Sequence, residues 1–269
     1  KSIGGKPGKK CDLDIRMKPG PRGDGWEIYN VIYQSRPGFW VTGNLYKPVG
    51  RKGPFPGVLR VIGHAASGKQ SKMVYDMHIE LARKGYVSLA IDGLGQGERM
   101  ICGRGFGEAS PTSNHYAQGS RAFLVGANLA GYMVWDGMRG IDYLLSLPEV
   151  DDSRIAVTGC SGGGTMSIYL GCIDERISVV VPVSAGGSKH FACNYDAEQN
   201  LYARFRDGFD NQAMFALCAP RPLKVITEAA GPLDIPEPSY EAARGIYELY
   251  GVPELIQYQK THHPHGYGP

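Results

Sequence analysis

The sequence predicts an α/β protein in which a mainly parallel sheet of eight strands carries helices on both faces. Short apolar runs rich in β-branched residues alternate along the chain with longer segments of helical periodicity. Most of these runs are continuously apolar, which is typical of parallel strands buried on both faces. The 269 residues, of which 42% are hydrophobic, suffice for one large core. We therefore expect a single main domain over residues 26–269.

The first elements are expected to differ from the rest. Residues 1–25 are rich in glycine, proline and lysine, so we expect an N-terminal extension that runs over the surface. Alternating residues over 26–33 and 39–46, joined by residues 35–38, predict an antiparallel hairpin. The other elements are expected in this order: strand 58–62, helix 71–84, strand 87–91, an irregular stretch 93–120, helix 122–147, strand 154–158, helix 165–170, strand 177–183, a helical turn 211–217, strand 223–227, helix 239–250 and strand 255–259.

The composition excludes several classes of function. The net charge is +3, the basic surplus lies near the start of the chain, and no basic stripe with interleaved aromatic residues occurs, which argues against nucleic acid. No apolar run approaches the roughly 18 residues of a membrane span. The six cysteines show no C-x-x-C spacing, which argues against a zinc site or a disulfide scaffold. They leave room for one or two disulfides, so a secreted or periplasmic location stays open, as does the oligomeric state.

The stretch Gly159-Cys160-Ser161-Gly162-Gly163 lies where an expected strand meets an expected helix. A Gly-x-Ser-x-Gly at such a junction is the nucleophile elbow of an α/β-hydrolase fold. It predicts Ser161 as the nucleophile, with the backbone N–H of Gly162 facing the oxyanion. Cys160 precedes the apex, so we expect its thiol to point away from the cleft.

A serine hydroxyl needs a base to take its proton, and in this fold the partners follow in the order serine, acid, histidine. Three histidines, His262, His263 and His265, directly follow the last expected strand. We predict His265 as the general base, with His263 as the second choice. The alternative is a metal-binding or solvent-exposed histidine cluster.

The acid is expected on the loop after residues 223–227. Asp234 and Glu228 are the candidates. We predict Asp234, because it lies deeper in the loop and has the reach to meet a histidine. Glu228 follows the strand by one residue, and its side chain could equally face the sheet.

The second oxyanion donor is expected from the loop after residues 58–62. Its small residues allow a backbone N–H to approach a substrate carbonyl, and Ala65 or Ala66 would be the donor. We expect His64 to be structural and hydrogen-bonded beneath the site. We expect Glu98 and Arg99, in a glycine-rich loop without a phosphate-binding pattern, to form an internal ion pair.

From about Trp26 to its C-terminus, the chain resembles the acetyl xylan esterase-like branch of the α/β-hydrolases. The resemblance rests on Gly63-His64 with Gly68-Lys69, Asp92–Arg99, Trp135-Asp136 with Arg139 and Asp142, Val157–Gly164, Asp174-Glu175-Arg176 and Ala219–Leu223. As a set, these motifs are specific for the branch but not for a substrate. The resemblance implies serine-dependent hydrolysis of carboxylic esters, often acetyl groups on plant polysaccharides, without a cofactor or a metal.

The chain also departs from its relatives. It is similar to the glucuronoyl esterases, but those have arginine directly after the nucleophile, where this chain has Gly162, and many have a glutamate after the next strand, where this chain reads Val183-Ser184-Ala185. Relatives often carry the acid before a Pro-Leu-like pair, where this chain has Gly231. Relatives also continue into a final helix, which we expect to be absent here, truncated or supplied by another chain, because the sequence stops four residues after His265.

The favoured function is therefore a serine carboxylesterase that acts on a small-molecule or carbohydrate ester, with acyl groups on carbohydrates as the expected substrates. The missing acid at Gly231 supports an alternative, a catalytically degenerate hydrolase-fold protein that binds a ligand in what was the active-site cleft. A glucuronoyl esterase or an amidase on the same fold would use the same residues.

Overall fold

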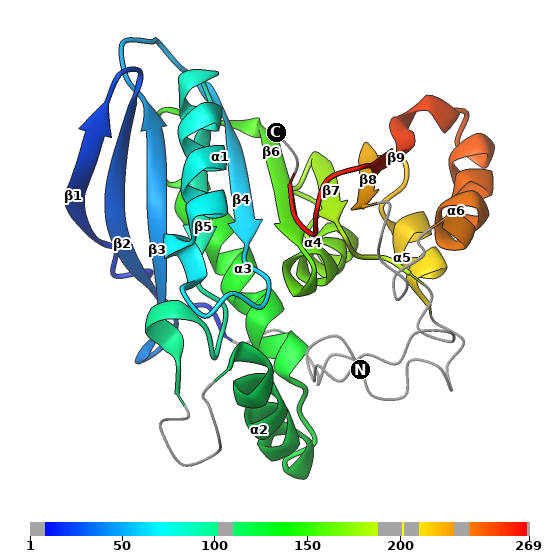
Figure 1. Ribbon diagram of the computed structural model, residues 1–269, viewed down its shortest axis with the longest axis horizontal. Helices are drawn as coiled ribbons and strands as arrows, with labels where there is room; N and C mark the ends of the chain where they lie inside the picture. The colour runs from blue at the N-terminus through cyan, green and yellow to red at the C-terminus, as the bar shows by residue number, and fades with distance from the viewer. Residues whose placement is uncertain (1–8, 102–109, 188–200, 202–209, 229–236, 268–269) are drawn as a thin grey trace.

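The computed structural model describes residues 9–101, 110–187, 201, 210–228 and 237–267. Within these residues nine strands form one sheet, in the order β1-β2-β3-β5-β4-β6-β7-β8-β9 (Figure 1). The strands are β1 (Arg16–Gly23), β2 (Trp26–Arg36), β3 (Phe39–Pro48), β4 (Phe55–Val61), β5 (Val87–Ile91), β6 (Val150–Cys160), β7 (Val179–Val183), β8 (Leu223–Glu228) and β9 (Ile256–Thr261). The pairs β1–β2, β2–β3 and β3–β5 are antiparallel. All other neighbouring strands in this order are parallel. The expected mainly parallel α/β fold is confirmed.

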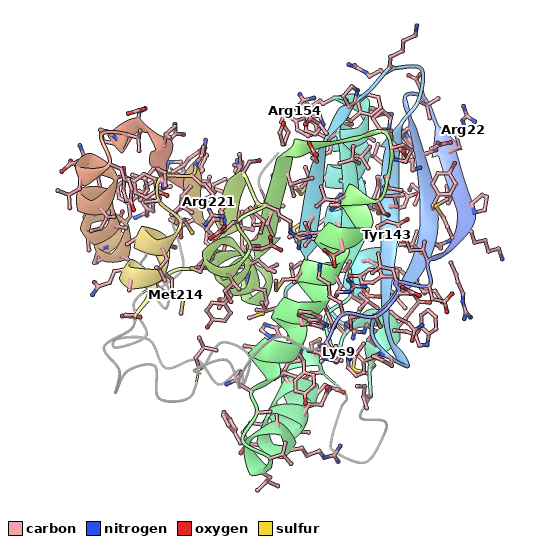
Figure 2. All side chains as sticks on the ribbon, turned by 180° about the vertical axis from the view of Figure 1, so that it is seen from behind. Lys9, Arg22, Tyr143, Arg154, Met214 and Arg221 are labelled. Carbon is pink, nitrogen blue, oxygen red and sulfur yellow. The ribbon has the colours of Figure 1, made fainter. Side chains whose placement is uncertain are left out.

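Helices cover both faces of this sheet (Figures 1 and 2). Helix α1 (Lys72–Arg83) packs on one face, and α3 (Leu129–Leu145) and α4 (Gly162–Ile173) pack on the other. The remaining helices are α2 (Pro111–Leu124), α5 (Asn211–Leu217), α6 (Glu237–Leu249) and the short 3₁₀ turns η1 (Gly68–Gln70), η2 (Gly97–Arg99) and η3 (Pro253–Leu255). Within the described part of the chain, no helix has the length and apolar character needed to cross a bilayer.

The two faces have separate cores because side chains alternate along each strand. Leu59 and Val61 of β4 belong to the large core beneath α3 and α4. Ile62, which follows β4, and Ala90 of β5 belong to a smaller core beneath α1. The polar side chain of Arg60 lies between the two apolar neighbours on its strand and is only 1% exposed. Because its Nη1 contacts the Met77 sulfur, Arg60 places a buried cation on the α1 side of the sheet.

The sheet has one strand more than the sequence predicts. Residues 16–23 were expected to run over the surface but pair antiparallel with β2, from Arg16 opposite Ile32 to Gly23 opposite Trp26. A β-bulge or irregularity after Pro19 interrupts the register. The glycine, proline and lysine content is tolerated because β1 is an edge strand with mostly exposed side chains. The composition of an edge strand resembles that of a surface loop, so the strand was missed.

The helix expected over 122–147 is divided, and part of the stretch expected to be irregular is helical. Helix α2 begins at Ser110-Pro111, where Ser110 forms a capping box with Ser113. It ends near Gly126, which has a φ of 70°. Asn128 then caps α3 by accepting a hydrogen bond from the N–H of Ala130 at 2.8 Å. The helical periodicity ran across this break because both helices bury an apolar face.

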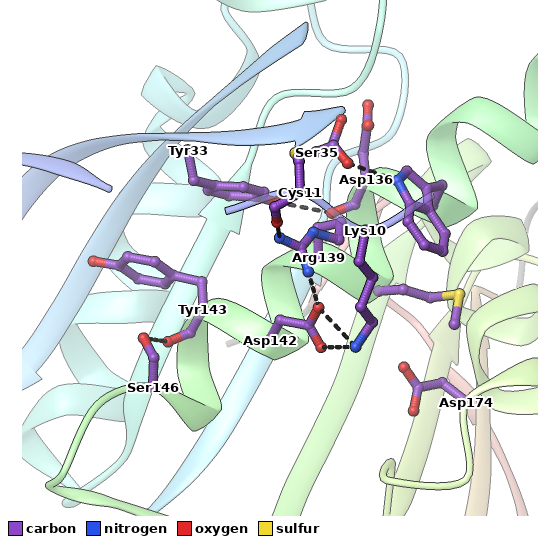
Figure 3. A network of polar contacts seen from close by, with 12 residues as sticks. Lys10, Cys11, Tyr33, Ser35, Asp136, Arg139, Asp142, Tyr143, Ser146 and Asp174 are labelled. Atoms are coloured by element: carbon purple, nitrogen blue, oxygen red, sulfur yellow. Dashed lines mark hydrogen bonds and ion pairs between the residues drawn. The ribbon is translucent and has the colours of Figure 1, made fainter. Parts of the chain in front are cut away.

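The segment before β1 is docked on α3 (Figure 3). Arg139 donates to the carbonyl oxygen of Cys11 and to Asp142, and the Lys10 ammonium lies 3.3 Å from Asp142. Lys10 is exposed, so its ion pair contributes little stability. The hydrogen bonds of the buried Arg139 guanidinium therefore hold this segment more strongly than the ion pair of Lys10 does. The described cysteines (Cys11, Cys160, Cys172 and Cys218) form no disulfide with one another, and Cys102 and Cys193 lie outside the described residues.

Candidate active site

Ser161 occupies a sharp turn between β6 and α4. Its backbone has a φ of 60° and a ψ of −124°, a strained conformation for a residue with a side chain. Its N–H donates to the carbonyl oxygen of Val183 at 2.9 Å, and its carbonyl accepts from the N–H of Thr165 at 3.0 Å. These two bonds tie the turn to β7 and to the first turn of α4. Ser161 stays partly exposed, while its neighbours on both sides are buried.

Glycines at this turn allow a close approach of three backbone segments. A Cβ on Gly159 would lie 2.2 Å from the carbonyl oxygen of Gly163, and a Cβ on Gly163 would lie 2.3 Å from that of Val61. Neither position can hold a side chain without moving the backbone. The local sequence therefore folds this way because only glycine lets α4 start so close to β4 and β6.

The thiol beside Ser161 is not available for chemistry in this conformation. Cys160 is only 6% exposed. Burial raises its pKa to about 11, although a hydrogen bond with Ser184 acts in the opposite direction. A thiolate is the reactive form of cysteine, so this environment disfavours Cys160 as a nucleophile.

Among the described residues, Glu228 and His265 form a close acid–imidazole contact at this edge of the sheet. Nδ1 of His265 lies 2.6 Å from Oε1 of Glu228, and Oε2 of Glu228 accepts a hydrogen bond from the Ser184 hydroxyl. Burial raises the pKa of Glu228, but the bonds from Ser184 and His265 outweigh it and hold this pKa below its ordinary value. An ionised carboxylate can only accept, so Nδ1 of His265 carries the proton and Nε2 faces away from Glu228.

The three strand ends that carry these residues are neighbours. The N–H of Ser161 bonds to Val183 at the end of β7, and the N–H of Ser184 bonds to Ile226 of β8 at 2.8 Å. Ser161, Ser184 and Glu228 therefore lie at the carboxyl ends of β6, β7 and β8, where this class of sheet places its functional groups. Among the described residues, the Ser161 hydroxyl makes no hydrogen bond to His265. Catalytic hydrogen bonds are often long before substrate binds.

The other residues predicted for the site differ in whether they are described and in whether they contact a carboxylate. Asp234, the predicted acid, lies outside the described residues. His262 and His263 are described, and of the three clustered histidines His265 is the one with a carboxylate partner among the described residues. Sequence reasoning missed the contact of Ser184 with Glu228, although it noted Val183-Ser184-Ala185 as a stretch that departs from the glucuronoyl esterases.

In the loop after β4, where the second oxyanion donor is expected, one of the two candidate N–H groups is without a backbone partner among the described residues. The N–H of Ala65 donates to the carbonyl oxygen of Gly63 at 2.6 Å, so it is engaged within the loop. The N–H of Ala66 makes no such bond among the described backbone groups, and Ala66 is exposed. The geometry therefore favours Ala66 over Ala65.

His64 lies directly against the residue after the nucleophile. A Cβ on Gly162 would be 2.7 Å from Cε1 of the His64 ring. The His64 Nε2 is hydrogen-bonded to Nδ1 of His115 at 3.1 Å, and Nε2 of His115 donates to the carbonyl oxygen of Leu94 at 2.6 Å. His64 is thus hydrogen-bonded beside the elbow, and the absence of a side chain at Gly162 makes room for its ring.

A buried ion pair holds the loop after β4 on the sheet. The Asp92 carboxylate accepts from the N–H of Lys69 at 2.8 Å, from its ammonium at 2.6 Å and from the Thr42 hydroxyl at 2.8 Å. The expected pair between Glu98 and Arg99 is wrong, because Glu98 pairs with Lys69 and Arg99 pairs with Asp136 at 2.8 Å. Adjacent side chains on a helical turn point in different directions, so both find partners elsewhere.

Comparison with known proteins gives a consistent result. Residues 8–203 match the family described as acetyl xylan esterase (AXE1). The chain is 28% identical over 191 residues to YtaP of Bacillus subtilis (strain 168), named as a hydrolase, across 65% of this chain and 60% of that protein. It is 26% identical over 170 residues to 4-O-methyl-glucuronoyl methylesterase 1 of Wolfiporia cocos (strain MD-104), across 51% of this chain and 41% of that protein. The chain thus spans less than two thirds of the length of either relative.

Solved structures show the same fold. The structure named methylesterase BT1017 superimposes with a TM-score of 0.75 at 22% identity, covering 100% of this chain and 56% of that one. Acetyl xylan esterase 1 from Thermoanaerobacterium sp. JW/SL YS485 superimposes with a TM-score of 0.65 at 20% identity, covering 94% of this chain and 84% of that one. These likenesses confirm the expected α/β-hydrolase architecture.

Proposed function

This chain belongs to the acetyl xylan esterase (AXE1) family, and from that premise we propose that it is a serine carboxylesterase acting on acylated carbohydrates. One observation carries the proposal. A strained, partly exposed serine at a strand-to-helix turn lies two strands away from a carboxylate that holds an imidazole at 2.6 Å. In this proposal they are the nucleophile, the acid and the base of a serine hydrolase triad.

Ser161 acts as the nucleophile in this proposal. Its hydroxyl oxygen attacks the ester carbonyl carbon while Nε2 of His265 takes the proton. The negative charge that develops on the carbonyl oxygen is stabilised by the N–H groups of Gly162 and Ala66. His265 then gives the proton to the leaving alcohol, and the acyl group stays on Ser161. Water, activated by the same imidazole, releases the acid and restores the serine.

Glu228 is the acid of this proposed triad. Its carboxylate orients His265 through Nδ1 and stabilises the imidazolium that forms in the transition state. The Ser184 hydroxyl occupies its second oxygen, which leaves the first free for the imidazole. Asp234, predicted from the sequence, stays a competing candidate whose contribution mutagenesis can measure.

A second candidate substrate is the methyl ester of a sugar acid. Two of the similar proteins carry methylesterase in their names, which supports this candidate. The residue after the nucleophile speaks against a close match to the glucuronoyl esterases, because their arginine has no counterpart at Gly162. A side chain there would collide with His64 in its present position.

A fluorophosphonate probe and a substrate panel test the proposal. The probe should label Ser161 covalently, since it reacts only with an activated serine. Acetylated xylo-oligosaccharides should be hydrolysed faster than methyl glucuronate esters, aryl acetates or acyl amides. A folded protein that neither reacts with the probe nor hydrolyses any ester would instead be a degenerate binding protein.

A further inference from the structure

Tyr267 returns the chain to the sheet two residues after His265. The segment after β9 runs back toward β6 (Figure 1), and the Tyr267 hydroxyl lies 2.7 Å from the Thr158 hydroxyl. Thr158 already donates its proton to the carbonyl oxygen of Val181 at 2.7 Å. Tyr267 must therefore be the donor to Thr158. This bond ties the histidine segment to β6, the strand that carries Ser161.

The ring of Tyr267 covers a buried cation. The guanidinium carbon of Arg60 lies 4.4 Å from the ring centroid, and Arg60 is 1% exposed. Among the described residues no carboxylate pairs with Arg60, whose Nη1 contacts the Met77 sulfur at 3.0 Å. Burying a cation without an acid is costly, and the negative face of an aromatic ring offsets part of that cost. Arg60 and Tyr267 therefore stabilise one another.

The turn between the histidine and the tyrosine is held against α1. Gly266 has a φ of 141°, a conformation that side chains rarely adopt, and a Cβ there would lie 2.7 Å from the Met73 sulfur. Only glycine lets the chain bend at this point while packed on the helix. Tyr267 is thus held by β4 through Arg60 and by β6 through Thr158, and its preceding turn is held by α1.

We infer that Tyr267 and Arg60 are positioning residues that place His265 against Glu228, an inference that rests on the proposed function. The side chain of His265 is 58% exposed, and Glu228 is its one hydrogen-bond partner among the described residues. Two residues span at most about 7 Å, so a fixed Tyr267 limits how far the imidazole can move. Tyr267 and Arg60, which we call the anchor, therefore restrict the position of the exposed histidine, which has few contacts of its own.

Kinetics of three variants test this inference. Tyr267→Leu should lower kcat about 100-fold with little change in KM, the cost expected for a misplaced catalytic group. Tyr267→Phe keeps the ring and loses one hydrogen bond, so it should lower kcat about fivefold. Arg60→Met should resemble Tyr267→Leu, and the double variant should be no worse than either, because both remove the same anchor.

Tyr247→Phe is the matched control. It also removes a buried tyrosine hydrogen bond, to the carbonyl oxygen of Arg221 at 2.8 Å, but on α6 away from the histidine segment. It should leave kcat unchanged. An equal loss of activity in this control, or a fully additive double variant, would show that Tyr267 only stabilises the fold and would overturn the inference.

Proton NMR gives a readout that needs no activity. The Nδ1 proton of His265 in its bond to Glu228 should give a downfield resonance, identified by its absence from His265→Gln. That resonance should be lost in Tyr267→Leu and kept in Tyr247→Phe. Its persistence in Tyr267→Leu together with unchanged kcat would refute the inference. Its loss in a protein without any esterase activity would uphold the anchor and refute the proposed function instead.

Discussion

The Ser184 hydroxyl donates a hydrogen bond to the Glu228 carboxylate across the ends of two adjacent strands. Ser184 holds this position with a φ of 51°, which a non-glycine residue rarely adopts. The cost of that conformation is of order 1 kcal/mol, comparable to the gain from one charge-assisted hydrogen bond. Strain of this size at the end of a strand is typical of a functional site, and the hydrogen bond makes Ser184 a support for the carboxylate of Glu228, the proposed acid.

Removing the nucleophile should abolish hydrolysis without unfolding the protein. We expect Ser161→Ala to lower kcat by about 10⁴-fold or more, because loss of a triad serine leaves only binding and oxyanion stabilisation. Initial rates with an aryl acetate measure the effect. Cys160→Ala is the control and should keep substantial activity. A variant of Ser161 within about tenfold of the wild type would exclude the triad mechanism.

The acid can be assigned by two isosteric substitutions. Glu228→Gln should lower kcat by orders of magnitude, since a neutral amide stabilises neither the imidazolium nor the required tautomer. Asp234→Asn should change kcat less than about threefold if Glu228 is the acid. Steady-state kinetics at neutral pH decide between them. The opposite ranking would assign the role to Asp234.

The Ser184 bond predicts a shift in acid sensitivity. The pKa of Glu228 is lowered in the folded protein, so its carboxylate adds stability above the ordinary glutamate pKa of about 4.3 and loses it as the pH falls through the folded value. Ser184→Ala removes one of the contacts that lower this pKa. The variant should therefore melt at a lower temperature than the wild type at neutral pH, and its melting temperature should fall less than that of the wild type as the pH is lowered below about 4.3.

Thermal melts between pH 3 and 7, about the range in which carboxylates titrate, provide the measurement. Ser178→Ala is the control, because it loses a hydroxyl bond of 2.8 Å to the carbonyl oxygen of Ile155 without touching Glu228. Identical pH profiles for the two variants would show that Ser184 does not act on the carboxylate. We also expect Ser184→Ala to reduce kcat about fivefold, from the loss of one hydrogen bond to the acid.

The buried ion pair between Lys69 and Asp92, beside the loop after β4, should contribute more to the free energy of unfolding than a surface pair. Lys69→Met leaves the Asp92 carboxylate buried without its cation, which should lower the free energy of unfolding by about 3–5 kcal/mol. Lys72→Met is the matched control, because Lys72 pairs with Asp76 while its side chain is 87% exposed, and its loss should cost about 0.5 kcal/mol or less. Urea denaturation compares them. Equal costs would mean that the loop is not held by Lys69.

The sequence by itself determined the Gly-x-Ser-x-Gly turn and the order of the main elements. The turn at Ser161 is a local feature, because glycines at 159 and 163 fix which backbone segments can approach one another. Buried strands such as β4 and β5 were predicted because a strand that is buried on both faces has a continuously apolar sequence. Edge strand β1 was not, because one unpaired side imposes no such pattern.

Only the tertiary structure decided which side chains meet. From the sequence, the side chain of Glu228 could face either the sheet or the site. The structure shows that Glu228 is the last residue of β8 and that its carboxylate accepts a hydrogen bond from Ser184 at the end of the neighbouring strand. Lys69 and Glu98, or Tyr267 and Arg60, are joined by packing between distant elements. A local pattern sets backbone conformation over a few residues, whereas the choice of a polar partner depends on which groups burial leaves within reach.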